Sequence, residues 1–184
     1  MQNNLVKLKE TFLDHCKLWG HLPAAAFPVR SEGSDLLFYN SGMAPLKDAF
    51  KFGLSSDRSP LCGIQRCIRL GGKHNDYSNI GLSKRHLSFF EMMGAFSFGS
   101  YGRRYAIEMI WDLVLKLGFK PSNLIITVSC LDYETYSIWK SVVGCSWASL
   151  AHMASKTFEA LAVAASVAIA LKYMLLMMQA IGRS

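Results

Sequence analysis

The stretch that decides the fold is Gln65-Arg66-Cys67-Ile68-Arg69-Leu70-Gly71-Gly72-Lys73-His74-Asn75-Asp76, a short mixed run that ends in a polar loop led by two glycines. A second run, Arg85-His86-Leu87-Ser88-Phe89-Phe90-Glu91-Met92-Met93, follows after that loop. Two such runs joined by a long polar loop predict an antiparallel hairpin. We expect its strands at residues 63–70 and 86–93.

Strand periodicity divides the side chains of the first run between two faces. Alternation places Gln65, Cys67 and Arg69 on one face and Arg66 and Ile68 on the other. Arg69 then projects from a rigid strand, and its planar guanidinium suits bidentate capture of a phosphate or a carboxylate.

The glycine pair gives the loop its chemical interest. Gly71 and Gly72 allow a tight turn and a close approach of the backbone to a ligand, and Lys73 adds a compact positive charge. With Arg69, these residues could hold a nucleotide phosphate while negative charge builds up during its transfer. The spacing matches neither a P-loop nor GxGxxG, and a solvated basic hairpin without a ligand is an equally open interpretation.

The returning run carries an aromatic pair. Phe89 and Phe90 point to opposite faces of a strand, so that one can pack in the core while the other lines a site. An aromatic ring beside Arg69 could stack on a base, although core packing is the common role of such a pair. Glu91 could orient the amino group of a ligand or pair with an arginine.

The rest of the chain adds helices and short strands. An amphipathic helix ending at Gly20 is predicted from apolar and aromatic positions at helical spacing. These positions are Leu5, Leu8, Phe12, His15 and Trp19. Further elements are expected as a strand at 36–39, a helix at 105–117, a strand at 124–128 and a helix at 133–142. Antiparallel strands with interspersed helices indicate an α+β domain.

Composition limits the class of protein. The chain has 184 residues, 51% of them hydrophobic and 18% charged, which excludes a disordered chain. Its net charge of +7 suits a polyanionic partner such as nucleic acid, a nucleotide or a membrane surface. The five cysteines form no CxxC pair. A reducing, cytoplasmic location is therefore expected, without a disulfide framework or a cysteine-rich zinc site. The first ten residues lack the apolar core of a signal peptide.

Charge becomes sparse after Gly144, and we predict a boundary there between residues 1–144 and residues 145–184. Residues 157–181 are nearly all apolar, which predicts a buried or interfacial C-terminal helix. A membrane anchor is less favoured, because Lys172 interrupts the apolar run before it reaches the length of a span. A third hypothesis is that this tail is read from a shifted frame, which sequencing of the genomic DNA would decide.

The ordered series of motifs between Phe12 and about Gly144 resembles the start of the catalytic domain of the alanyl-tRNA synthetases, which are class II aminoacyl-tRNA synthetases. Outside the hairpin, the similar motifs are Phe12-Leu13, Gly20-His21, Leu36-Leu37-Phe38-Tyr39-Asn40-Ser41-Gly42-Met43, Lys47-Asp48, Phe50 and Phe96-Ser97-Phe98-Gly99. The most specific part is the hairpin itself, from Gln65 to Asp76 and onward through Asn79, Gly81 and Arg85-His86 to Met92.

This resemblance implies an antiparallel sheet flanked by helices, incomplete in this chain. It also implies ATP-dependent activation of alanine, followed by transfer to tRNA. The hairpin resembles motif 2 of the class. By that likeness Arg69 grips the α-phosphate and Lys73 stabilises charge at the reacting phosphorus, so that both are candidate catalytic residues.

The same resemblance assigns the remaining ATP-binding residues. Phe90 would stack on the adenine, and Glu91 and Met92 would belong to the same site. His74 and Asp76 would lie near ATP or the tRNA acceptor stem. Magnesium would bridge phosphate oxygens, and no side chain of this chain is assigned as a metal ligand.

The resemblance is incomplete. Gly94-Ala95-Phe96-Ser97-Phe98-Gly99-Ser100-Tyr101-Gly102 lacks two polar side chains of the family pattern, and the usual His-His is His86-Leu87 here. We find no likeness after Gly144, and the Asn-Phe-Trp segment, motif 3, most of the alanine pocket and the zinc site of the family are missing. We therefore expect a truncated ligase that is inactive alone, unless a second polypeptide completes the site. The alternatives are a non-catalytic nucleotide- or RNA-binding module and a membrane-tethered protein.

Overall fold

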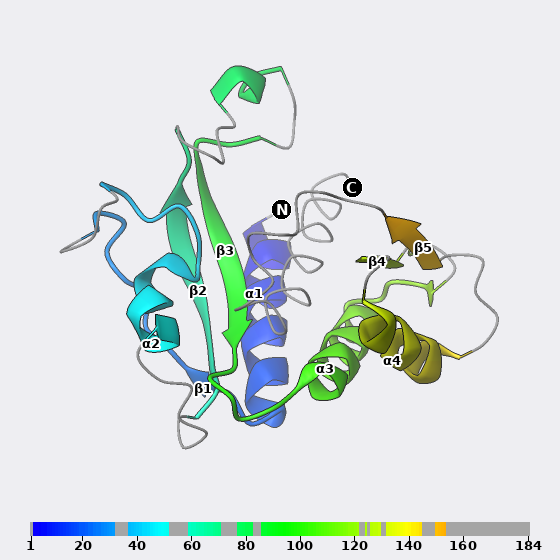
Figure 1. Cartoon of the computed structure of the whole chain (residues 1–184). Helices are drawn as coiled ribbons and strands as arrows, with labels where there is room; N and C mark the ends of the chain where they lie inside the picture. The colour runs from blue at the N-terminus through cyan, green and yellow to red at the C-terminus, as the bar shows by residue number, and fades with distance from the viewer. Residues whose placement is uncertain are drawn as a thin grey trace. The chain divides into compact units, whose positions relative to one another are not determined.

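The structure, a computed structural model, describes residues 2–31, 37–51, 59–70, 77–82, 86–121, 124, 126–129, 132–144 and 150–153 (Figure 1). The chain divides into two compact units, one within residues 1–100 and one within residues 101–170. Each unit is described by itself.

A three-stranded sheet forms the centre of the first unit. Strand β2 (Leu61–Ile68) pairs antiparallel with β3 (Phe89–Phe96), while the two-residue strand β1 (Leu22–Pro23) pairs parallel with β2. The predicted hairpin is thus confirmed, with Cys67 opposite Phe90. Compared with the expected ranges, β2 is shifted by two residues and β3 by three, both away from the connecting loop, because the buried part of β3 continues past Met93 to Phe96.

Helix α1 (Gln2–Leu18) packs against this sheet. Gly20, two residues after its end, has a φ of 78°, the left-handed conformation that favours glycine after a helix. Phe12, His15 and Cys16 are the buried side chains of α1. The sequence placed Leu5 on the same apolar stripe, but residues 4–7 are all exposed. The first turns of α1 therefore present their apolar side chains to solvent.

A 3-10 turn, η1 (Ala44–Leu46), leads directly into the short helix α2 (Lys47–Lys51). Figure 1 shows α1 and α2 on opposite sides of the hairpin. Phe50 of α2 packs on Phe96 and Phe98, at centroid distances of 6.3 and 4.9 Å. A second 3-10 turn, η3 (Tyr77–Asn79), lies between the two hairpin strands.

The strand predicted at 36–39 does not form within the described residues. Phe38 makes a single isolated bridge with Arg30, and Tyr39 donates its N–H to the carbonyl of Val29. The run therefore pairs with residues 29–31 through one bridge and its flanking hydrogen bonds, and not as a strand. Leu36 lies outside the described residues.

The second unit contains helices α3 (Arg103–Lys116) and α4 (Tyr133–Val143), with strand β4 (Ile126–Ser129) between them. All three were predicted within a few residues. Trp111 and Trp139 join the two helices in an edge-to-face contact. Leu115 near the end of α3 is 41% exposed.

Polar contacts cap the N-terminus of α4 and link it to α3. Asp132 accepts the Thr135 N–H at 3.1 Å, as an N-cap does. Arg103 donates from Nη1 to Asp132 at 3.1 Å and to Glu134 at 2.6 Å. These contacts tie the first turn of α3 to the first turn of α4.

The α+β architecture is confirmed as a small mixed sheet with helices. Two parallel pairings were not predicted, the β1–β2 pair and the pair that β4 forms with β5 (Leu150–Met153). The apolar helix expected at 157–181 lies outside the described residues, and the boundary after Gly144 stays a prediction. In the part of the chain that the structure describes, every helix is too short or too polar to cross a membrane.

Candidate functional site

Arg69 directly follows β2 and is held by two contacts of its side chain. Its Nε donates to the backbone carbonyl of Asn40 at 2.9 Å. Its guanidinium carbon lies 5.3 Å from the centre of the Phe90 ring, within cation–π range. Its own backbone N–H donates to Ser88 across the hairpin. The backbone and the side chain of Arg69 are thus both fixed to the sheet.

Those contacts leave most of the guanidinium available. Among the residues that the structure describes, no carboxylate forms an ion pair with Arg69. Its two terminal amino groups can therefore donate to an anion. A guanidinium oriented through Nε presents its terminal donors as the fork that phosphate and carboxylate groups fit.

Phe90 and Phe89 point to opposite faces, as predicted. Phe90 is half-buried and lies beside Arg69, whereas Phe89 is 52% exposed. Opposite Phe90, Cys67 is buried, and burial raises the pKa of its thiol to about 11. The thiol therefore stays neutral at physiological pH and does not compete with a ligand anion for Arg69.

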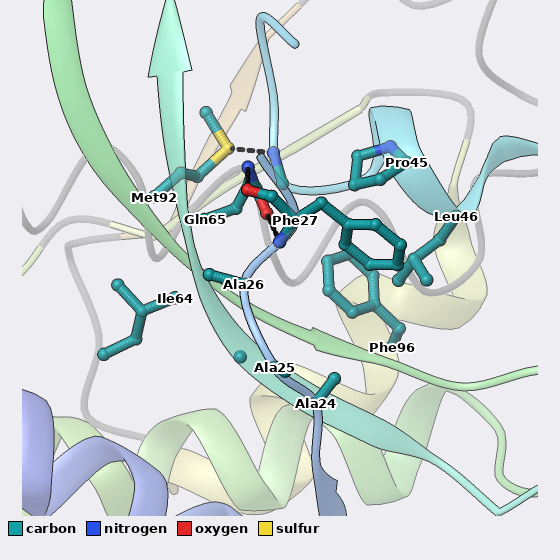
Figure 2. Close-up of a pocket in the computed structure, with 12 residues that line it drawn as sticks. Ala24, Ala25, Ala26, Phe27, Pro45, Leu46, Ile64, Gln65, Met92 and Phe96 are labelled. Carbon is teal, nitrogen blue, oxygen red and sulfur yellow. Dashed lines mark hydrogen bonds between the residues drawn. The ribbon is translucent and has the colours of Figure 1, made fainter. Parts of the chain in front are cut away.

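Met92 lies further along the same face and contacts the turn before η1. Its sulfur accepts the Gly42 N–H at 3.1 Å. Beside it is a mostly apolar cavity of about 20 Å³, lined by residues 24–27, Pro45 and Leu46 and, on the sheet, by Gln65 and Met92 (Figure 2). A space of this size holds about one water molecule.

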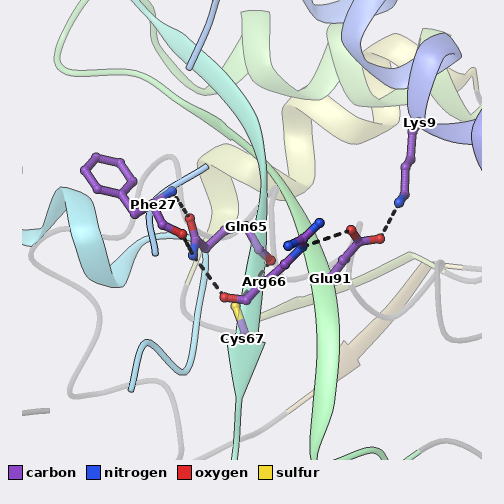
Figure 3. Close-up of polar contacts among 6 residues, drawn as sticks. All are labelled: Lys9, Phe27, Gln65, Arg66, Cys67 and Glu91. Carbon is purple, nitrogen blue, oxygen red and sulfur yellow. Dashed lines mark hydrogen bonds and ion pairs between the residues drawn. The ribbon is translucent and has the colours of Figure 1, made fainter. Parts of the chain in front are cut away.

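Gln65 fixes the other wall of this cavity. Its Oε1 accepts the Phe27 N–H at 2.9 Å, and its Nε2 donates to the Phe27 carbonyl at 3.0 Å and to the Arg66 carbonyl at 2.9 Å (Figure 3). The buried amide thus serves the Phe27 backbone as a neighbouring strand would. The segment 24–27 is held against β2 by this side chain and by the hydrogen bond that the Ala24 N–H donates to the Cys62 carbonyl.

Glu91 projects from the face that α1 covers. It forms ion pairs with Lys9 of α1 and, at 3.9 Å, with Arg66 of β2 (Figure 3). Of the two roles considered for Glu91, pairing with an arginine is confirmed. Its place is on the opposite face from Arg69 and Phe90, and its part in ATP binding stays a prediction.

The structure therefore gathers Arg69, Phe90 and Met92 on one face of the hairpin. Lys73, His74 and Asp76, the other predicted site residues, lie outside the described residues. In the described part of the chain, no group of three His, Cys, Asp or Glu side chains could hold a metal ion.

Two features of the site were not predicted. The Asn40 carbonyl that holds Arg69 had no signal in the sequence, because every residue carries a carbonyl. The Nδ1 atom of His86 is buried without a hydrogen-bond partner. Buried polar atoms are nearly always satisfied, so this one is a free acceptor or donor beside the hairpin.

Comparison with known proteins gives the class of the chain. Residues 7–166 match the family model described as tRNA synthetases class II (A), and the chain belongs to this family. The match extends beyond Gly144, so the interpretation that the likeness to the family ends at Gly144 was wrong.

The similar curated proteins are alanine–tRNA ligases. That of Ehrlichia chaffeensis is 40% identical over 149 residues, which cover 79% of this chain and 17% of the relative. That of Parvibaculum lavamentivorans is 37% identical over 153 residues, 82% of this chain and 17% of the relative. The resemblance to the alanyl-tRNA synthetases is thereby confirmed. The chain spans about 17% of the length of these relatives.

Proposed function

We propose that these 184 residues are part of an alanine–tRNA ligase catalytic domain, that they bind ATP at the motif 2 hairpin and that they do not aminoacylate tRNA by themselves. The observation that carries the proposal is the state of Arg69. Its Nε is fixed on Asn40 and its guanidinium lies over Phe90, while the described residues offer no carboxylate to its terminal donors. A cation held this way suits a phosphate next to an aromatic ring that can receive a base.

The proposed reaction is the activation of alanine. The alanine carboxylate attacks the α-phosphorus of ATP, the bond to the bridging oxygen breaks, and pyrophosphate leaves. Arg69 binds the α-phosphate and stabilises the charge that builds up there. Phe90 packs on the adenine, and the neutral Cys67 thiol leaves the positive charge of Arg69 uncompensated.

The remaining proposed residues come from the loop between the strands. Lys73 would add a second positive charge at the reacting phosphorus, and His74 and Asp76 would approach ATP or the tRNA acceptor stem. Met92 would support the site indirectly, because its sulfur holds the backbone at Gly42.

Magnesium fits this proposal as an ion carried by the nucleotide, where it would neutralise phosphate charge. The described residues provide no cluster of side chains to hold it. Phosphate oxygens would therefore supply most of its ligands.

The proposal that the chain is inactive alone rests on what the sequence lacks. Motif 3, whose arginine would hold the other side of ATP, is not found, nor is most of the alanine pocket. A second polypeptide that supplies these parts would complete the site. ATP bound from one side only is not positioned for in-line attack, and positioning accounts for much of the rate in this chemistry.

Two measurements on the whole chain test the proposal. Calorimetric titration with ATP and Mg²⁺ is expected to show binding, and the alanine-dependent exchange of pyrophosphate into ATP is expected to stay at background. Exchange at the rate of a complete alanine–tRNA ligase would refute inactivity. Absence of any ATP binding would refute the role of the hairpin.

The second candidate is a non-catalytic module that binds RNA, favoured by the net charge of +7. For this function, affinity for the tRNA acceptor stem would fall steeply as salt rises, because cations on the protein displace counterions from the phosphates. RNA binding without measurable ATP binding would favour this candidate over the first.

A further inference from the structure

Two fully buried cysteines meet where α1 packs on β2. Cys16 lies in the last turns of α1 and Cys62 near the start of β2, and both are 0% exposed. Their thiols are hydrogen-bonded to one another. Arg69 follows the far end of β2, so this pair lies outside the proposed ATP site.

The backbone holds the two cysteines together. The His21 N–H donates to the Cys16 carbonyl at 2.9 Å, which ties the chain after α1 back to the helix. Two residues on, Pro23 is the sheet partner of Cys62, and the Ala24 N–H donates to the Cys62 carbonyl at 2.7 Å. The backbones of both cysteines are thus anchored to the same short stretch, residues 21–24.

We propose that Cys16 and Cys62 form an oxidation-sensitive pair, which a peroxide converts into a disulfide that links α1 covalently to β2. No part of the proposed ligase chemistry uses either thiol. The bond would close a loop that contains β1, η1 and α2, and would restrict the unfolded chain accordingly.

The local charges favour Cys62 as the thiol that reacts first. The hydrogen bond from Cys16 and the nearby positive charge of Lys17 lower the pKa of Cys62, although burial opposes this. The same hydrogen bond and burial raise the pKa of Cys16. The other titratable groups around the pair are His15 and His21, both buried.

The reaction balances with hydrogen peroxide as the oxidant. The Cys62 thiolate attacks one peroxide oxygen, the O–O bond breaks, and hydroxide leaves, which gives a sulfenic acid on Cys62. The Cys16 sulfur then attacks the Cys62 sulfur and displaces its oxygen, which leaves as water with the proton of Cys16. Overall, two thiols lose two electrons and the peroxide is reduced to two waters. A small neutral oxidant is needed, because neither sulfur is exposed.

Cys67 is a matched control within the same strand. It is also 0% exposed, but it lies on the other face of β2, and its thiol contacts the Gln65 carbonyl at 3.5 Å. Burial raises the pKa of its thiol. Burial alone therefore predicts equal behaviour of Cys67 and Cys62, whereas the pair predicts that only Cys62 becomes cross-linked to Cys16.

The test is treatment of the folded chain with hydrogen peroxide, followed by peptide mapping by mass spectrometry without reductant. We expect one dominant linked peptide, Cys16 to Cys62, with a mass loss of two hydrogens that dithiothreitol reverses. Cys67→Ala should keep the link and Cys16→Ala should abolish it. The oxidised chain should melt several degrees higher than the reduced chain.

If Cys16→Ala does not fold, the disulfides formed in the folded wild-type chain are compared with those formed in the urea-unfolded chain. The unfolded chain should give a mixture of pairings among its five cysteines. The same mixture from the folded chain would overturn the proposal. So would conversion of Cys16 and Cys62 into separate sulfinic acids without a link between them.

Discussion

The two faces of the β2–β3 hairpin are built from alternate residues of the same strands, yet different forces hold their neighbours. On the helix face, α1 packs through buried Phe12 and Cys16 and through the Lys9–Glu91 ion pair. On the loop face, irregular segments are held by hydrogen bonds, two of them between Gln65 and the Phe27 backbone and another from Arg69 to the Asn40 carbonyl. Apolar packing dominates the first face, whereas hydrogen bonds hold the irregular segments on the second.

The largest effect is expected from breaking the helix face at its centre. Phe12 is 1% exposed, and Phe12→Ala should lower the free energy of unfolding by about 3–5 kcal/mol, because it removes buried area and leaves a cavity. Urea denaturation measures this loss. Leu5→Ala is the control from the same helix, since Leu5 is 52% exposed, and a similar loss there would contradict the assignment of the buried face.

The loop face should show a dependence on alkaline pH that comes from Cys67. Its pKa is 9.0 in the unfolded reference and about 11 in the fold, so the unfolded chain loses this proton first as pH rises. Ionisation of this thiol does not affect the free energy of unfolding below pH 9. Between pH 9 and about pH 11 it lowers the free energy of unfolding by roughly 2–3 kcal/mol. Denaturation of the wild type and of Cys67→Ala should show a difference that changes over this interval. A constant difference would mean that the thiol is not shielded.

Gln65 tests whether the loop face depends on hydrogen bonds. Gln65→Ala removes both contacts with the Phe27 backbone, and we expect a loss of about 1–3 kcal/mol. Hydrogen exchange should rise at the Phe27 amide while the amides of α1 stay protected. Equal loss of protection on both faces would show that the two are not independent.

The smallest effect is expected from the ion pair on the helix face. The Lys9 and Glu91 side chains are 29% and 30% exposed, and partly solvated pairs contribute about 0.2–1 kcal/mol. Glu91→Gln should therefore change stability by less than about 1 kcal/mol, with the effect shrinking in high salt. A larger loss that salt does not affect would indicate a packing role for Glu91.

The comparison also explains which parts were predictable from the sequence. The hairpin and the helices α1, α3 and α4 follow from local periodicity, and so do the opposite directions of Arg66 and Arg69. The parallel pairing of β5 with β4 joins residues far apart in the sequence, and no local signal specifies it.

Within the site, the types of side chain on each face could be predicted, but the contacts that hold these side chains in place could not. A guanidinium and an aromatic ring on one face follow from alternation. The hold of the Asn40 carbonyl on Arg69 depends on how an irregular segment returns to the sheet, and the contact of Cys16 with Cys62 depends on how α1 packs on β2. Both are set by tertiary packing, which the residue pattern does not encode locally.

Arg66 lies in β2 and Arg69 directly follows it. Comparing these two arginines tests most directly whether Arg69 holds the nucleotide. Arg69 lies on the loop face beside Phe90, while Arg66, 65% exposed in its side chain, lies on the helix face. Calorimetric titration with ATP and Mg²⁺ should show a loss of affinity of at least about tenfold in Arg69→Ala, as for a charged hydrogen bond to phosphate, and little change in Arg66→Ala. Equal affinities in the two variants would contradict the claim that Arg69 holds the nucleotide.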